Sequence, residues 1–255
     1  MLERFYALNI IKDAYKKKSS VLHLTDETVD NFIFVPPEVS HLPLLEELHI
    51  TGRNISKIPR EIGGLSNLSF LLLSSESLSE LPDEIASLTN LKYLWVLGNF
   101  SYFPKGIFSL KNLETLTFFS NQTIKNLPSE IANLRKLIYL DIGVGLTQLP
   151  SEMGELKKLK YLKLSGNKLE NLPAELGQLS KLECLSLGST IIFPRRNETI
   201  NRLAAINHPT TRPASIKTLP VEIKNITSLK YLDLRGNSLP VPPEILEKLM
   251  HLNQY

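Results

Sequence analysis

The sequence predicts an α/β fold: a right-handed solenoid with a parallel β-sheet on its concave side. Short helical turns and loops are expected on the convex side, and a capping helix at the N-terminus. Two observations predict this fold. A proline-centred motif returns ten times at intervals of 21 to 26 residues, and leucines recur between the prolines at one spacing. Such self-similarity, at a period of about 20 to 50 residues, is typical of arrays in which each unit stacks on its neighbours.

The proline motif is close to Leu-Pro-x-Glu-Ile. Its prolines are Pro36, Pro59, Pro82, Pro104, Pro128, Pro150, Pro173, Pro194, Pro220 and Pro242. All but Pro104 and Pro194 are followed two residues later by glutamate. Proline suits the first helical position, and a glutamate there faces the positive end of the helix dipole. Each motif therefore predicts the start of a short helical turn.

The residues between the prolines follow the pattern L-x-x-L-x-L-x-x-N-x-L, clearest over residues 159–169 and 229–239. Its L-x-L portion alternates with period two, which predicts a short strand with leucines pointing inward and the intervening residues outward. An asparagine can close the turn after the strand, because its amide bonds backbone groups of neighbouring repeats. The asparagines at this position are Asn99, Asn121, Asn167 and Asn237.

This pattern resembles the leucine-rich repeat family from about Val21 to Leu252. The 23-residue LPxEI form is similar to that of bacterial leucine-rich repeat proteins and of plant intracellular Ras-group-related leucine-rich repeat proteins. The resemblance implies a horseshoe with a buried ladder of turn asparagines. Asn121, in the sequence Asn-Gln-Thr, is therefore expected to be buried and unable to carry a glycan. The resemblance is specific for fold and says almost nothing about function.

We expect a single domain over residues 1–255, with a helical cap at 1–20, about ten repeats at 21–243 and a C-terminal cap at 244–255. Residues 2–17 form an amphipathic pattern, and a cap over the first repeat is favoured over a membrane-surface role. Residues 193–219 break the repeat, because Pro209 and Thr211 fall where strand leucines belong. They form either a degenerate repeat or a protruding basic loop, and a functional loop and a decayed repeat both remain open.

Composition excludes several classes of protein. A net charge of +3 with 22% charged residues is too mild for a nucleic-acid binder. The single cysteine, Cys184, allows no internal disulfide. The sequence has no run of about 18 apolar residues, so no membrane span is expected. The opening residues lack a secretory pattern, so an intracellular, cytoplasmic and unglycosylated protein is expected.

Enzyme motifs are missing from the sequence. There is no phosphate-binding glycine loop, no Cys/His metal spacing and no nucleophile elbow. We therefore expect no catalytic residues, no metal, no cofactor and no enzyme activity. His23 and His49 share one outward column, which alone makes a weak metal site. Cys184 also points outward, and an ordinary thiol is expected because its strand holds no histidine or basic neighbour.

Stacking converts the outward strand positions into three columns along the concave face. There the sequence predicts a partner-binding patch of Phe70, Leu72, Tyr93, Trp95, Leu97, Phe119, Tyr139, Asp141, Tyr161 and Lys163. Tyrosine is frequent before the first strand leucine of this repeat type, so the tyrosines alone do not indicate a binding site. The prediction therefore depends on the other large apolar residues of the patch. Exposed apolar patches usually mark interaction sites, and Trp and Tyr are enriched at binding hot spots. Trp95 is expected to be partly exposed, flanked by Phe70 or Leu72 and by Phe119, so Trp95→Ala should cost less than about 1 kcal/mol of stability.

Two functions fit these features. The first is a non-enzymatic, monomeric scaffold for protein–protein interaction that binds a protein or peptide on the concave patch, without nucleic acid or membrane. The alternative is a recognition or autoregulatory domain of a larger multidomain protein, of immune-receptor or ligase type, whose active domain is absent from this sequence.

Overall fold

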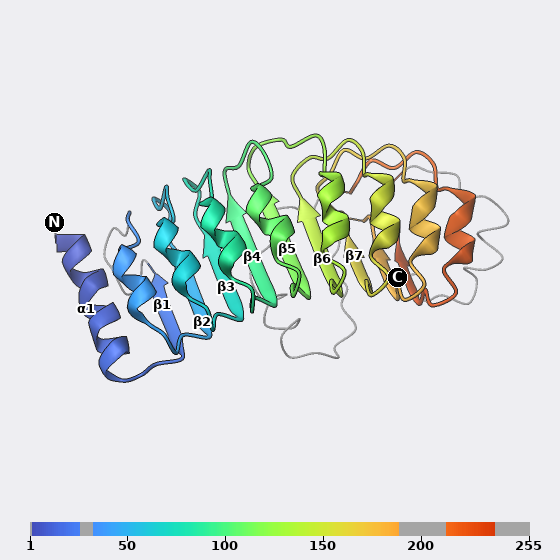
Figure 1. The fold of residues 1–255 in the computed structure, drawn as a ribbon. Coiled ribbons are helices and arrows are strands. Elements are labelled where there is room, and N and C mark those ends of the chain that lie inside the picture. The colour runs from blue at the N-terminus through green and yellow to red at the C-terminus, as the bar shows by residue number, and fades with distance from the viewer. Residues whose placement is uncertain (1, 26–32, 189–212, 238–255) are drawn as a thin grey trace.

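The protein is a single-layer sheet backed by a row of short helices, and the computed structural model describes residues 2–25, 33–188 and 213–237 (Figure 1). Helix α1, Leu2–Lys16, precedes one parallel sheet whose strand order follows the chain. The strands are β1 Val21–Thr25, β2 Glu47–Thr51, β3 Phe70–Ser74, β4 Tyr93–Gly98, β5 Thr115–Ser120, β6 Tyr139–Gly143, β7 Tyr161–Lys163, β8 Cys184–Ser186 and β9 Tyr231–Asp233. The predicted solenoid with a parallel sheet and an N-terminal helix is confirmed.

A row of 3-10 helices lines the other side of the array, one for each proline motif of the described residues (Figure 1). They are η1 Pro37–His41, η2 Arg60–Gly64, η3 Asp83–Ser87, η4 Lys105–Ser109, η5 Ser129–Asn133, η6 Ser151–Glu155, η7 Ala174–Gln178 and η8 Val221–Asn225. The sheet face that points away from these helices is called the concave face below.

Each 3-10 helix begins one residue later than the sequence predicts. Pro59, for example, is the N-cap of η2 and has an extended backbone with φ −69° and ψ 146°. Its carbonyl accepts a hydrogen bond of 3.1 Å from the Ile62 N–H, which closes the first turn. The proline therefore acts through its carbonyl, while its missing N–H costs nothing because an N-cap donates no helical bond.

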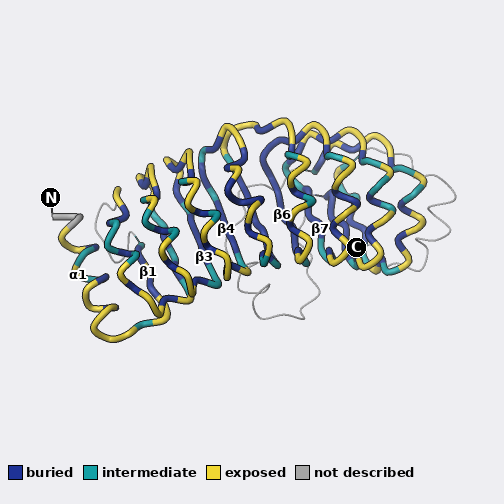
Figure 2. The backbone as a smooth tube through the Cα atoms, in the orientation of Figure 1, coloured by how far each residue is buried: buried dark blue, intermediate teal, exposed yellow. Residues whose placement is uncertain are grey.

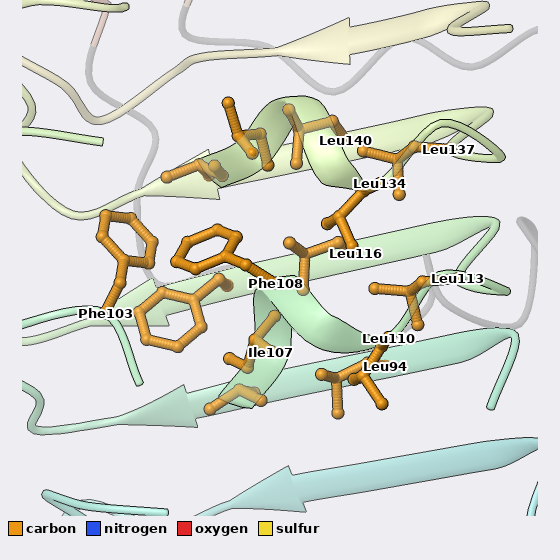
Figure 3. Packing of buried hydrophobic residues seen from close by; sticks show 14 of the residues in the cluster. Leu94, Phe103, Ile107, Phe108, Leu110, Leu113, Leu116, Leu134, Leu137 and Leu140 are labelled. Carbon is orange, nitrogen blue, oxygen red and sulfur yellow. The ribbon is translucent and has the colours of Figure 1, made fainter. Parts of the chain in front are cut away.

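The core fills the space between the sheet and the 3-10 helices (Figures 2 and 3). Strand leucines such as Leu94, Leu116 and Leu140 point into it and are at most 1% exposed. They belong to one cluster of buried residues that runs from Ala7 on α1 to Leu232 on β9. Because the cluster is continuous across repeats, each repeat buries apolar surface of its neighbours, and α1 covers the first repeat.

Asn167 forms the buried turn that the family resemblance implies. Its Oδ1 accepts from the N–H groups of Val144 (3.2 Å) and Leu146 (3.0 Å) in the preceding repeat. Its Nδ2 donates to the carbonyls of Ile142 (2.7 Å) and Leu164 (2.8 Å). One side chain thus satisfies four buried backbone groups and joins two repeats.

The prediction that Asn121 is buried is wrong, because Asn121 is exposed. Strand β5 has 6 residues, against 3 in β7, and extends as far as Ser120. The Ser120 hydroxyl closes the turn by donating to the Phe100 carbonyl at 2.8 Å and accepting from the Gln122 N–H at 3.1 Å. A serine one position earlier therefore closes the turn and leaves the Asn121 side chain exposed to solvent.

The described residues on either side of the irregular segment belong to the same repeat. Strand β8 pairs directly with β9, so no strand lies between them. Thr218 contacts Asn171, and the two residues are 47 positions apart in the sequence, whereas equivalent residues of neighbouring repeats are about 23 apart. The Ala214 N–H donates a hydrogen bond to the Leu187 carbonyl. Residues 213–219 therefore complete the repeat that β8 begins, and we interpret the 24 residues 189–212 between them as an insertion. The remainder of the predicted segment, including its arginines, lies outside the described residues.

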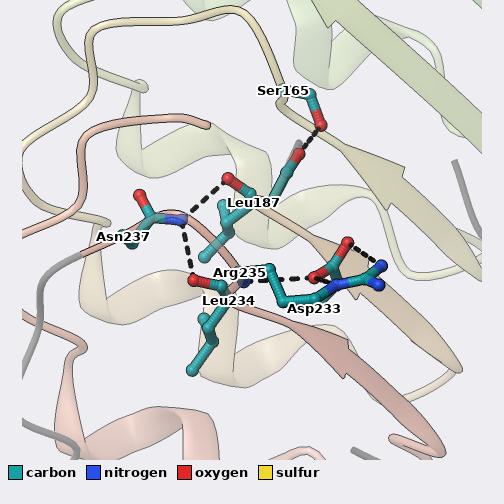
Figure 4. Close-up of polar contacts among 7 residues, drawn as sticks. Ser165, Leu187, Asp233, Leu234, Arg235 and Asn237 are labelled. Atoms are coloured by element: carbon teal, nitrogen blue, oxygen red, sulfur yellow. Dashed lines mark hydrogen bonds and ion pairs between the residues drawn. The ribbon is translucent and has the colours of Figure 1, made fainter. Parts of the chain in front are cut away.

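Asn237 forms hydrogen bonds with backbone groups that precede and follow this insertion (Figure 4). Its Nδ2 donates to the carbonyls of Leu187 (2.9 Å), before the insertion, and of Leu234 (3.1 Å). Its Oδ1 accepts from the Ile216 N–H (2.8 Å), after the insertion. The asparagine ladder therefore holds at Asn167 and Asn237, each of which follows a three-residue strand.

We expect Asn167→Ala to lower the free energy of unfolding by about 3 kcal/mol, because it leaves several buried backbone groups unsatisfied. Asn121→Ala is the matched control and should change stability by less than about 0.5 kcal/mol, since its side chain is exposed. Urea denaturation followed by circular dichroism measures both. Equal effects of the two substitutions would contradict the conclusion that an asparagine closes one turn and a serine closes the other.

Candidate interaction surface on the concave face

The predicted columns are present in the sheet register. The first column is Val21, Glu47, Phe70, Tyr93, Thr115, Tyr139, Tyr161, Cys184 and Tyr231. The second is His23, His49, Leu72, Trp95, Thr117, Asp141, Lys163, Ser186 and Asp233. The third runs Thr25, Thr51, Ser74, Leu97, Phe119 and Gly143. Side chains of one column lie about 4.8 Å apart, so they contact one another.

Trp95 lies outside the leucine core, as predicted, but the prediction that it is partly exposed is wrong. It is 3% exposed and forms a separate small cluster with Leu72, against which Phe70 packs. Side chains converge on the inner face of a curved sheet, so a large ring is enclosed by its neighbours in the same and adjacent columns. Position in a strand indicates the face of a residue but not its exposure.

Phe119 is buried because its ring lies over a glycine on the neighbouring strand. Its partner on β6 is Gly143, and a Cβ built on that glycine would lie 2.5 Å from the Phe119 ring. The ring therefore covers the glycine backbone. The sequence shows a glycine in this column, but not that the neighbouring phenylalanine lies across it.

The ten predicted site residues divide into two groups. Six are buried: Leu72, Trp95, Phe119, Tyr139, Asp141 and Lys163. Four are half-buried and present surface: Phe70, Tyr93, Leu97 and Tyr161. The accessible part of the predicted patch is therefore smaller than the sequence indicates, and three of its four residues lie on β3 and β4.

A row of rings crosses the first four strands. His23 and His49 are stacked with centroids 4.3 Å apart, and Phe70 stacks on His49 at 5.0 Å. Tyr93 follows at 6.2 Å from Phe70. The shared column of the two histidines is confirmed. Within residues 2–25, 33–188 and 213–237, no three His, Cys, Asp or Glu side chains form a group that could hold a metal ion.

The middle of the concave face holds a buried polar network. Lys163 Nζ lies 2.9 Å from Asp141 Oδ2, and both side chains are at most 5% exposed. The Tyr139 hydroxyl donates to the same oxygen at 3.0 Å. Burial, together with the Asp141 carboxylate, raises the pKa of Tyr139 well above its ordinary value. Asp141 and Lys163 occupy one column in adjacent repeats, which is the only sequence signal for this pair.

The C-terminal end of this column is also polar (Figure 4). Asp233 accepts two bonds from the Arg235 guanidinium, at 2.8 and 3.1 Å. Beside it, Cys184 is buried, and burial raises the pKa of its thiol to about 11. A thiol with this pKa is a poor nucleophile at neutral pH, which agrees with the expected ordinary cysteine.

A hollow of about 530 Å³ lies at the carboxyl ends of β1–β4. Three residues of the third column, Thr25, Thr51 and Ser74, line it with their short side chains, and Leu97 ends the row. His49 lines it from the second column. The hollow therefore adjoins the row of rings and offers hydroxyl, imidazole and apolar contacts together with the charged groups of Arg53 and Glu76.

Comparison with known proteins identifies the family. A model for a leucine-rich repeat region matches residues 129–213, and a leucine-rich repeat model matches residues 228–249. A leucine-rich repeat protein of Leptospira interrogans is 31% identical, with 88% of this chain and 57% of that chain covered and a TM-score of 0.67. The chain belongs to the leucine-rich repeat family.

Two receptors share the fold of this leucine-rich repeat protein. A TDR receptor is 20% identical over 96% of this chain and 40% of its own, with a TM-score of 0.71. The ectodomain of the Arabidopsis receptor kinase HAESA is 23% identical over 80% of this chain and 32% of its own, with a TM-score of 0.60. The chain thus spans about half or less of these proteins. No curated protein matches it.

The leucine-rich repeat family is generally a non-enzymatic fold for protein–protein interaction. In the part of the chain that the structure describes, the longest helix, α1, has 15 residues, and none has the length and hydrophobicity of a membrane span.

The burial of Trp95 changes the expected effect of its truncation. We now expect Trp95→Ala to lower the free energy of unfolding by about 3–5 kcal/mol, because it opens a cavity. Leu94→Ala, on the core side of the same strand, should cost about 2–5 kcal/mol. Urea denaturation measures both. A loss of stability below about 1 kcal/mol for Trp95→Ala would contradict the burial of Trp95 and support the partly exposed position that the sequence predicts.

The buried thiol predicts a loss of stability in alkali. In the unfolded chain Cys184 ionises near its ordinary pKa of 9.0, whereas in the folded protein its pKa is about 11. Stability should therefore be intact below pH 9 and fall as the pH rises to about 11, by about 2–3 kcal/mol in total from this group. Urea denaturation at several pH values between 8 and 11 should show a shallower decline for Cys184→Ala. Parallel curves for the two proteins would contradict this.

Proposed function

We propose that this leucine-rich repeat chain is a non-enzymatic module that binds a protein or peptide on the N-terminal half of its concave face. The hollow beside the row of rings carries this proposal. It brings the small residues Thr25, Thr51 and Ser74 next to the half-buried side chain of Leu97 and to His49, which belongs to the row of rings. The lining is mostly polar, with hydroxyl groups, the charged residues Arg53 and Glu76, and Leu97 as its large apolar side chain. Polar groups that converge in a concave site fix the orientation of a ligand.

The chemistry of this surface suits an extended peptide that crosses the strands. One peptide side chain would enter the hollow, and others would contact Phe70 and Tyr93. Tyr161 would extend the contact beyond the buried Asp141–Lys163 pair. HAESA, whose fold is similar, has been solved in complex with the peptide hormone IDA, which supports a peptide as the ligand class.

Two features support the absence of enzyme activity. A glutamate of the proline motif lies at the start of each described 3-10 helix except η4, and its position near the helix N-terminus is a structural reason for it. The buried carboxylate Asp141 is neutralised by Lys163. These carboxylates therefore have structural positions or a structural partner.

We further propose that the chain acts as one monomeric domain in the cytoplasm. The array carries a single cysteine, which is buried, so its stability comes from leucine burial and not from disulfides. Asn121 is exposed, so a glycan there is sterically possible. The intact mass of native protein from its source should equal that of the unmodified chain, and a decrease in mass after glycosidase treatment would contradict a cytoplasmic location.

A peptide-selection experiment tests the binding site. Peptides selected from a random displayed library on the wild-type protein should lose at least tenfold in affinity, or about 1.4 kcal/mol, when Ser74→Tyr fills the hollow. Ser66→Tyr is the matched control, since Ser66 is exposed and outside the hollow. Fluorescence anisotropy gives the dissociation constants. If both variants are folded and Ser74→Tyr binds the peptides with unchanged affinity, the hollow is not the peptide-binding site.

A further inference from the structure

Exposed apolar side chains gather at the N-terminal end of the described residues. Most of the large ones belong to the first 44 residues: Phe5, Tyr6, Tyr15, Val21, Ile33, Phe34 and Leu44. Tyr102 and Val221 are the examples further along the chain. Apolar patches of this kind usually mark an interaction site.

Helix α1 has more apolar surface than a cap needs. Ala7, Ile11 and Ala14 face the core and are buried. A second stripe lies along one flank of the helix, where Phe5, Leu8, Lys12 and Tyr15 follow one another at spacings of 3, 4 and 3 residues. That is the spacing at which a helix contacts another helix packed alongside it.

This flank forms one wall of a groove of about 550 Å³ between α1 and η1. Leu8, Ile11 and Tyr15 give the groove apolar lining, and Tyr15 remains 60% exposed. Lys12 and Lys16 line the same wall, and His41 and Glu38 line the opposite side. Lys17, the residue after the end of α1, pairs with Asp13 at 2.7 Å. The lysines outnumber the single acidic residue of the lining.

We propose that the groove between α1 and η1 binds an amphipathic helix of a partner protein, with acidic residues flanking its apolar stripe. The stripe of the partner packs on Leu8, Ile11 and Tyr15, as in helix-in-groove recognition. Its carboxylates face Lys12 and Lys16, whose aliphatic stems add apolar contact. This surface is separate from the concave hollow and provides a second binding site.

Two other occupants fit the groove less well. A second copy of the chain, related by a two-fold axis, would bring the lysines of both α1 helices together. A membrane surface requires apolar side chains in one plane. Tyr6 and Tyr15 are nine residues apart, or about 180° around the helix, so the exposed rings point to opposite sides.

The test uses two labelled 18-residue helical peptides with leucines at heptad positions a and d, one with glutamates at the remaining exposed positions and one with lysines. Fluorescence anisotropy with the full chain should show at least tenfold tighter binding of the acidic peptide. Tyr15→Ser should weaken this binding at least tenfold. Tyr102→Ser is the matched control, because Tyr102 is also an exposed tyrosine, at 54% against 60%, and should have no effect.

A charge reversal tests the second half of the proposal. Lys12→Glu with Lys16→Glu should invert the preference between the two peptides, whereas Lys105→Glu with Lys111→Glu, at exposed positions on η4 and after it, should not. Ser74→Tyr should leave this binding intact, which separates it from the concave site. The proposal is overturned if the acidic peptide does not bind, or if the control variants weaken it equally.

Two further outcomes would assign the groove to another occupant and overturn the proposal. One is binding to vesicles with anionic lipid that is lost in both Tyr6→Ser and Tyr15→Ser. The other is a doubled mass in analytical ultracentrifugation that returns to the monomer value in Tyr15→Ser.

Discussion

The structure depends on the burial of leucines between neighbouring repeats. A single repeat has a strand of 3 to 6 residues and one helical turn, which cannot enclose its own apolar side chains. Each repeat must therefore stack on the next in one register. This requirement aligns the prolines, the strand leucines and the turn groups along the array, and it gives α1 its place over the first repeat.

The same stacking determines what the concave face can offer. Strands about 4.8 Å apart bring successive side chains of a column into contact, so large residues bury one another. Trp95 with Leu72, and Phe119 over Gly143, show this effect. Accessible surface remains where a column carries short side chains, as from Thr25 to Ser74. A hollow on this face is therefore produced by small residues in register, with large residues beside them.

The sequence predicts the architecture and the three columns well, because both follow from spacing. It predicts exposure poorly, since exposure depends on what the neighbouring columns hold. It also misplaces Asn121, because strand length decides whether an asparagine or the serine before it closes the turn. The boundaries of the insertion, by contrast, could have been found in the sequence: Ala214, Ile216 and Leu219 occupy repeat positions when 24 residues are omitted after Gly188.

The buried Asp141–Lys163 pair divides the concave face into two regions of different character. Removing two charges from water is costly, and the pair is tolerated because the two charges lie 2.9 Å apart and Tyr139 adds a hydrogen bond. A ligand that displaced either partner would have to replace that compensation. Binding energy is more readily available between β1 and β4, where the hollow presents hydroxyl, imidazole, charged and apolar groups that are not part of the buried pair. The groove beside α1 lies at this same end, so one larger partner could occupy both surfaces with two separate segments.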